Sequence, residues 1–295
     1  MRLCWGAICA AAFVALTVPA VAAAQPAQQA PQAEMNTEAA LEGWQQTAVR
    51  QDSVFTVGEG VATRKTAAGS ELVFRGVGQV PADLADKGWN HVGDPDSAQG
   101  YLFDAYEQSG RSTKLFRATD PAGATADFVY TLEPGARFNN SWVAVTPDGQ
   151  WMLNGEWDRM SRFLIFPTPL LNTAAAQAGP ITRSGYLNLD KPVQNVQGCT
   201  FFDATTLLCT SDVPNGGGTT PTLLEVSWSG VLDGKDKSAR VRSVGTLPQL
   251  SVCHGTFESE GLDYDPASGN LTVVVDKPIP CKMQSSVYTF TRKNS

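Results

Sequence analysis

Four polar residues of different chemistry stand at equivalent places in a pattern that recurs along the chain. Each lies eleven residues before a hydrophobic residue of a predicted strand: His91 before Leu102, Ser141 before Met152, Gln197 before Leu208 and Glu260 before Leu271. An imidazole, a hydroxyl, an amide and a carboxylate in one place could transfer protons, orient a substrate or bind a cation. A shift of one residue in the alignment brings Asn90, Asn140 and Gly198 to these places instead.

The imidazole and the hydroxyl suggest proton transfer. His91 is suited to be a general base near neutral pH, oriented by Asp94 or Asp96. Ser141 beside it would be a nucleophile, although no nucleophile elbow surrounds Ser141. The alternative for His91 is a structural histidine that hydrogen-bonds to the backbone.

The carboxylate suggests a cation. Glu260 could ligate calcium together with the amide oxygens of Asn140 and Gln197, because calcium takes carboxylate and amide oxygens. The alternative for Glu260 is a solvated loop charge, but Gly261 and a predicted strand follow it directly, which favours a place in a site. Calcium is the one cofactor that the sequence indicates.

Further candidates are a second histidine and the tryptophans. His254 lies between Cys253 and Gly255, and it would overhang the site or be an exposed loop histidine. The tryptophans of the first two repeats favour packing, but exposed ones could stack on a sugar ring. The residues expected to contact a ligand are Gln197, Asn140, Asn90, Asp94 and Trp142.

Four repeated segments must position these residues. The segments begin at Asn90, Asn140, Val196 and Ser259, and each reads as a polar residue, a strand, a turn rich in Asp, Pro or Gly, and a second strand. A third strand follows each segment (TKLFRA, RFLIFP, TLLEVSW, SVYTF), and a fourth follows the first three (DFVYTL, GYLNL, RVRSVG). This pattern predicts an all-β fold, a single β-propeller of four to six blades with five favoured, and a sandwich is the alternative.

A propeller would bring the four polar residues together, because the residue before each innermost strand lies at the mouth of the central channel. The last repeat lacks its fourth strand, and an N-terminal strand is expected to supply it. The stretch 71–80 (ELVFRGVGQV) fits that place, whereas 53–66 (SVFTVGEGVATRKT) would be an additional blade or part of the closure.

The N-terminus and the cysteines indicate export. Residues 1–24 have the charged start, short apolar run and small-residue exit of a secretory signal peptide. Residues 25–48 are expected to be a disordered leader, and residues 49–295 the propeller. Four cysteines remain after the signal, and we favour the disulfides Cys199–Cys209 and Cys253–Cys281 because each closes a local loop. Zinc is disfavoured because no C-x-x-C spacing occurs.

The charge of the chain bears on its partners. A formal net charge of −7 argues against nucleic acid and anionic membranes. We expect a secreted (extracellular or periplasmic) monomer that binds a small molecule or a carbohydrate.

The stretch EGLDYDPASGNLTVVVD, residues 260–276, resembles a blade motif of calcium-dependent propeller hydrolases of the gluconolactonase and paraoxonase kind and of the esterase-like phytases. The resemblance covers about fifteen residues closely and the other repeats only schematically. It implies that Glu260 binds a channel calcium, with Asn140 and either Asn195 or Gln197 as further ligands. The chain departs from the pattern because the Glu-Gly pair is in the last repeat and no aspartate completes the metal site.

Three functions remain open from the sequence. The leading one is hydrolysis of a small ester, lactone or phosphoester at the channel mouth, assisted by calcium. The second is non-catalytic binding of a carbohydrate or a protein. The third is a secreted biosynthetic enzyme that uses acid–base chemistry in the same pocket, since a fold alone does not decide function.

Overall fold

A computed structural model of the chain describes residues 35–37, 41–136 and 141–293. The expected signal peptide and the first part of the expected leader lie outside these residues, as does Asn140. The secondary structure of the described part is almost all β, as the repeats predict, with two helices of one turn each, α1 (Val54–Val57) and α2 (Ala82–Ala85). In the part described, no helix is long and apolar enough to cross a membrane.

The largest sheet has eight strands and nearly closes on itself. Its order is β10 (Ala144–Val145), β11 (Trp151–Asn154), β12 (Arg159–Pro167), β14 (Gly185–Gln194), β18 (Lys237–Thr246), β17 (Thr219–Trp228), β16 (Thr206–Pro214) and β15 (Val196–Asp203). Neighbours are antiparallel except β14 and β18, which pair in parallel and join two meanders of four strands. The two end strands, β10 and β15, contact each other, so the sheet resembles a barrel.

Two further sheets complete the repeats. One contains β13 (Gly179–Pro180), β9 (Thr125–Thr131), β8 (Thr113–Thr119), β7 (Tyr101–Glu107) and β5 (His91–Val92), with β6 (Asp96–Ala98) also paired to β7. The other contains β2 (Trp44–Ser53), β22 (Gln284–Arg292), β21 (Asn270–Asp276) and β20 (Glu258–Asp265). Every strand predicted within the four repeats is therefore present.

Two small sheets remain. One is the hairpin of β3 (Gly60–Thr66) and β4 (Gly69–Arg75), and the other pairs β1 (Met35–Thr37) with β19 (Gln249–Ser251). The stretch 53–66 thus contributes its strand β3 to an additional two-stranded unit, which β4 completes, rather than to a closure. Its first residues form α1 instead of a strand, because the Ser53 hydroxyl accepts a hydrogen bond from the Phe55 N–H and caps the turn.

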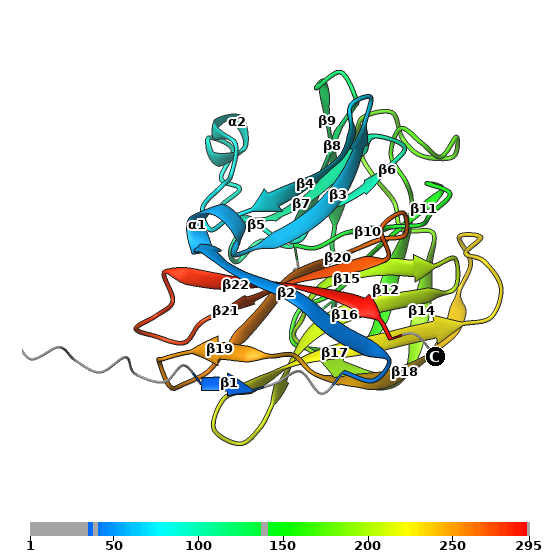
Figure 1. The fold of residues 1–295 in the computed structure, drawn as a ribbon. Helices are drawn as coiled ribbons and strands as arrows, with labels where there is room; N and C mark the ends of the chain where they lie inside the picture. The colour runs from blue at the N-terminus through cyan, green and yellow to red at the C-terminus, as the bar shows by residue number, and fades with distance from the viewer. Residues whose placement is uncertain (1–34, 38–40, 137–140, 294–295) are drawn as a thin grey trace, which may run out of the picture. The chain divides into compact units, whose positions relative to one another are not determined.

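The strand that completes the last repeat is β2, which pairs with β22 along its whole length (Figure 1). An N-terminal strand was expected here, but the expected residues, 71–80, were wrong, and the boundary of the leader at residue 48 was also wrong. Most side chains of β2 are exposed, so this edge strand needs backbone pairing and little hydrophobic pattern. Its polar sequence, WQQTAVRQDS, therefore resembled a leader.

The first strands of the five units, here called the inner strands, are β3, β6, β10, β15 and β20. They form a closed series of contacts, because β3 contacts β6 and β20, β10 contacts β6 and β15, and β15 contacts β20. This arrangement is compatible with a propeller. It also means that the corresponding ends of the inner strands meet, although they are far apart in sequence.

The core lies between neighbouring sheets. In β21, Leu271, Val273 and Val275 pack against side chains of β16 and β17, whereas Val274 faces the opposite way toward the β3–β4 hairpin. Side chains of a strand alternate between its faces, so a strand that is covered on both sides is a continuous apolar run. This explains the sequence LTVVV.

A carboxylate closes the centre of the inner-strand ring. Asp94, just before β6, is fully buried and accepts hydrogen bonds from the N–H groups of Val61 in β3 and Leu262 in β20. Its backbone oxygen accepts a third from Val143. Gly60, Gly198 and Gly261 surround it, and a Cβ at these positions would lie 2.5, 2.1 and 1.8 Å from an atom of Asp94. Only glycine permits this approach.

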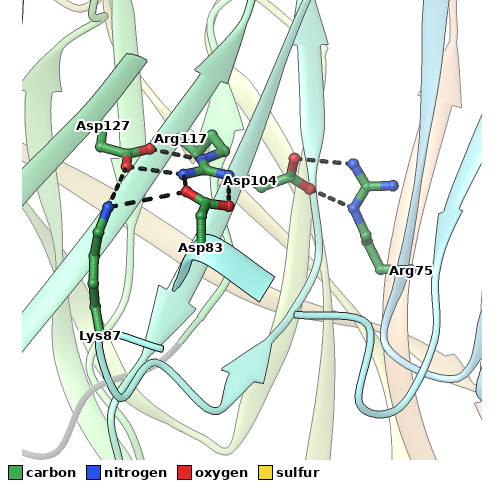
Figure 2. Close-up of polar contacts among 6 residues, drawn as sticks. All are labelled: Arg75, Asp83, Lys87, Asp104, Arg117 and Asp127. Carbon is green, nitrogen blue, oxygen red and sulfur yellow. Dashed lines mark hydrogen bonds and ion pairs between the residues drawn. The ribbon is translucent and has the colours of Figure 1, made fainter. Parts of the chain in front are cut away.

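Ion pairs join the units farther out. Arg75 of β4 donates to the Asp104 carboxylate of β7 at 2.6 and 2.9 Å and links the hairpin to the next sheet (Figure 2). Arg117 of β8 lies between Asp127 of β9 and Asp83 of α2, which fixes the short helix to the sheet.

Both expected disulfides are confirmed. Cys199–Cys209 links β15 to β16, and Cys253–Cys281 links two loops beside β20 and β22. Two intramolecular disulfides indicate that the protein folds in an oxidising environment, as extracellular proteins do.

Candidate active site

The four residues singled out by the repeats line one pocket. His91, Ser141, Gln197 and Glu260 all face a cavity of about 500 Å³. Each lies at or near the beginning of an inner strand, so the contacts of these strands bring together residues that are 169 positions apart (91 to 260). The hairpin supplies a fifth residue, Glu59, directly before β3.

The pocket is rich in carboxylates. It is lined by Glu59, Glu107, Glu258, Glu260 and Asp276, against two basic side chains, Lys282 and Arg111. Lys282 donates to Glu258 at 2.9 Å. The pocket therefore carries an excess of acidic groups, and it disfavours an anionic ligand that brings no cation with it.

Burial and mutual repulsion make several of these carboxyls weak acids. Burial, then the charges of Asp276 and Glu258, raises the pKa of Glu59 to about 8. Burial raises the pKa of Glu107 to about 7 and that of Asp276 to about 7.

The same causes act most strongly on Glu260. Although its side chain is accessible from the cavity, protein surrounds it, and burial followed by neighbouring carboxylates raises its pKa well above the usual range. The raised pKa favours the protonated form of Glu260 over the charged one.

His91 has the opposite character. Its side chain is 41 % exposed, but it lies within the walls of the pocket, and this burial lowers the pKa of His91 below 6.5, with Glu258 acting in the other direction. The imidazole is consequently neutral at pH 7. Its Nε2 lies 3.6 Å from a carboxyl oxygen of Glu59. The pocket thus contains a neutral base beside groups that are still protonated, which is what acid–base catalysis near neutral pH requires.

Gln197 belongs to a network at the wall of the pocket. Its amide donates to Asp212 of β16 at 3.1 Å and to Glu258 at 3.4 Å. Asp212 also accepts from the backbone N–H and the hydroxyl of Ser259. Burial raises the pKa of Asp212 to about 6. The network joins β15 and β16 to the first residues of β20, directly before Glu260.

A second cavity adjoins this pocket. It encloses about 460 Å³ and shares four lining residues with the first: Trp157, Gln197, Glu258 and Lys282. Its remaining wall includes Thr219, Thr256 and Ile279. The half-buried Trp157 therefore stands at the boundary of two adjacent spaces, where a ligand larger than one cavity would contact it.

Several expected site residues lie elsewhere. Asn90 is exposed and bonds to Ser109 rather than lining the pocket. His254 is exposed in the loop after Cys253 and does not line the pocket. Trp142 is fully buried, with its ring packed edge-on against Phe163, so it does not reach a ligand.

The expected partners of His91 were also wrong. Asp94 is buried in the ring of inner strands and bonds to backbone, and Asp96 bonds to the N–H groups of Ser97 and Val145. The carboxyl next to His91 is Glu59 instead. Ser141 lines the pocket, but the structure provides no hydrogen bond between its hydroxyl and His91.

A signal for Glu59 was present in the sequence. The dipeptide Glu59–Gly60 repeats Glu260–Gly261, and in both pairs the glycine packs against Asp94. The hairpin lacks the second half of the repeat, which hid the correspondence. Asp276 and Lys282 come from the end of β21 and the loop after it, and no spacing rule points to them.

Among the described residues, no group of three or more His, Cys, Asp or Glu side chains is arranged to hold a metal ion. Of the residues expected to bind calcium, Glu260 and Gln197 line the same pocket, and Asn140 lies outside the described part. A scan against models of known protein families gave no match, and a search of the curated proteins also gave none.

Proposed function

We propose that this protein is a secreted five-bladed β-propeller that hydrolyses a small neutral ester or lactone in the pocket around His91 and Glu260. The observation that carries the proposal is the convergence in one pocket of His91, whose pKa burial lowers, and Glu260, whose pKa burial raises. The closed series of inner-strand contacts supports five blades, with the β3–β4 hairpin as a reduced blade.

His91 acts as the general base in this mechanism. It takes a proton from a water molecule as the water oxygen attacks the carbonyl carbon, which forms a tetrahedral intermediate. The imidazolium that results is stabilised by the charge of Glu258. Glu59 lies 3.6 Å from the imidazole and is mostly neutral at pH 7, because its own pKa is raised to about 8.

Glu260 acts as the general acid. Because burial keeps it protonated, it donates its proton to the leaving alkoxide when the intermediate collapses. The proton on His91 then returns to Glu260 through solvent, and the products are a carboxylic acid and an alcohol. A phosphoester would bring its negative charge toward Glu258 and the partly ionised Glu107 and Asp276, so we favour a neutral ester or lactone.

Calcium stays a prediction, and the mechanism above uses the protein's own groups. If calcium bound Glu260, it would hold the carboxylate ionised and remove the proposed acid. Melting curves with calcium and with a chelator check this directly. An increase in melting temperature with calcium that disappears in Glu260→Gln would show that Glu260 is a calcium ligand rather than the general acid.

The two histidines of the chain provide a matched test. We expect His91→Gln to lower kcat/KM for p-nitrophenyl acetate or dihydrocoumarin at least a hundredfold. Glu260→Gln should lower kcat/KM by a similar factor for an aliphatic lactone such as δ-valerolactone, whose alkoxide leaving group needs a proton. His254→Gln, an exposed histidine outside the pocket, should stay within twofold. Equal losses in both histidine variants, or no hydrolysis of any neutral ester or lactone by the wild-type chain, would refute the proposal.

A binding function is the second candidate, and Trp157 favours it. This side chain is half-buried at the boundary of the two adjacent cavities, where its ring could stack on a sugar. A glycan array would then give a ligand for the wild-type chain, Trp157→Ala would lose it, and no ester or lactone would be hydrolysed.

Export through residues 1–24 is part of the proposal, and the two disulfides support it. The N-terminal sequence of the protein from the culture medium or periplasm should begin at Gln25. A chain that keeps residues 1–24 and stays in the cell fraction would contradict export.

A further inference from the structure

A separate cavity lies at the other end of the inner strands. It encloses about 700 Å³. Each of the five inner strands, together with the residues just before it, contributes an earlier residue to the candidate active site and a later one here. The pairs are Glu59 and Thr63 at β3, His91 and Asp96 at β6, Ser141 and Val145 at β10, Gln197 and Thr200 at β15, and Glu260 and Asp263 at β20. We call it the opposite cavity.

The two cavities do not communicate through the centre of the ring. Asp94 lies between them, and Gly60, Gly198 and Gly261 pack against it so closely that a methyl group would not fit. A ligand in the opposite cavity therefore cannot reach His91 or Glu260. The opposite cavity is a site of its own.

Two buried carboxyls, Asp96 and Asp263, lie at the inner side of this cavity. Asp96 accepts from the N–H groups of Ser97 and Val145, and Asp263 accepts from the Thr63 hydroxyl at 2.5 Å. Each carboxylate oxygen has two lone pairs, so these bonds leave both groups able to accept more. Burial raises the pKa of Asp263 to about 6, so it is mostly ionised above neutral pH. Burial, and then the charge of Asp263, raises the pKa of Asp96 well above its usual range, so Asp263 supplies the charge and Asp96 a neighbouring oxygen acceptor.

The wall around these carboxyls is mostly apolar. It includes Val145, Pro147, Phe201, Tyr264 and Pro266. The basic residues of the cavity are already engaged, because Arg64 donates to the carbonyl oxygens of Gly100 and Asp120, and Lys65 pairs with Asp265. Asp96 and Asp263 thus have no basic partner among the interactions described for them. A large apolar pocket with a few convergent polar groups is the usual form of a small-molecule site.

We propose that the opposite cavity binds an organic ammonium ion, with the ammonium group on Asp96 and Asp263 and an apolar body against Phe201, Tyr264 and the prolines. An ammonium group has only donors, and the two carboxyls offer acceptors where no basic side chain occupies them. The proposal does not depend on the hydrolase.

The test uses two small molecules that differ in charge. The full-length exported protein is titrated by calorimetry at pH 7.5 with 2-phenylethylammonium and with 2-phenylethanol, which has the same ring and chain length. We expect the ammonium compound to bind at least tenfold more tightly. Equal binding of the alcohol, or no binding of the amine up to millimolar concentration, would overturn the proposal.

Variants locate the site. Asp263→Asn should weaken the ammonium compound at least tenfold, whereas Asp265→Asn, which removes the rim carboxylate paired with Lys65, should stay within threefold. Glu260→Gln should leave the affinity unchanged, because Glu260 lies in the candidate active site. Loss of binding in Glu260→Gln would show that the amine binds in the candidate active site, and it would refute the proposal.

A measurement on the wild-type chain covers the case in which Asp263→Asn does not fold. Amide resonances of Ser97, Val145 and Thr200 should shift when the amine is added, and those of Ser141 and Gln197 should not. The reverse pattern would also refute the proposal.

Discussion

Removing the charge of Glu59 should make the protein more stable, and the gain should depend on pH. Glu59 is 9 % exposed, and its pKa is raised from 4.5 to about 8 by burial and by neighbouring carboxylates. A carboxyl whose pKa is raised on folding binds its proton more tightly in the folded chain. Its contribution to stability is therefore present below pH 4.5 and is lost as the pH rises to about 8.

The size of the effect follows from the pKa difference. One pKa unit corresponds to about 1.4 kcal/mol, so the difference between 4.5 and about 8 corresponds to about 5 kcal/mol above pH 8 and to roughly 3 kcal/mol at pH 7. Glu59→Gln keeps the size and polarity of the side chain but has no charge to bury. We expect the unfolding free energy of the variant to exceed that of the wild-type chain by up to these amounts.

Urea unfolding followed by circular dichroism at pH 4.5, 7 and 8.5 measures the gain. The difference between Glu59→Gln and the wild-type chain should be near zero at pH 4.5 and should increase at each step. Glu71→Gln, an exposed glutamate of β4, is the matched control and should remain within about 0.5 kcal/mol. A gain that is constant with pH, or a loss of stability at pH 8.5, would show that folding does not raise the pKa of Glu59.

Two further predictions concern the ring and its ties. Gly261→Ala should lower the unfolding free energy by roughly 3 kcal/mol, because its Cβ would lie 1.8 Å from an Asp94 oxygen. Gly217→Ala is the control and should change the unfolding free energy little, because open space surrounds Gly217. Equal urea midpoints for the two variants would refute this argument. Arg75→Met should lower the unfolding free energy by roughly 3–5 kcal/mol, because the Asp104 carboxylate is 3 % exposed and would be left without a countercharge. Arg50→Met removes a largely exposed ion pair and should lower the unfolding free energy by about 1 kcal/mol or less. Equal losses in the two arginine variants would contradict the second argument.

The parts of the fold that could be predicted are those that repeat. Residues His91, Ser141, Gln197 and Glu260 share one spacing to the next strand, and inner strands that contact in a ring convert equal spacing into convergence. The same logic found the strands of all four repeats. The disulfide pairings followed because each joins cysteines within one local unit.

The parts that could not be predicted are those without a repeated pattern. Strand β2 is stabilised by backbone bonds to β22, and its exposed polar side chains do not alternate as those of a buried strand do. His91 and Asp94 are three residues apart, but the chain between them carries the carboxylate into the ring, so proximity in sequence did not give a contact. Glu59 meets His91 only through the contact of different units.

The candidate active site contains several carboxyl groups that make the folded protein less stable. Glu59, Glu260 and Asp276 are each buried where the charged form is disfavoured, and each lowers stability near neutral pH. Uncharged side chains of the same size would remove that loss, as Glu59→Gln is expected to show. Carboxyls kept at such a disadvantage in one pocket, beside a histidine that burial keeps neutral, are typical of sites where protonation state matters for function. The instability itself is therefore an argument for acid–base chemistry at this mouth of the ring.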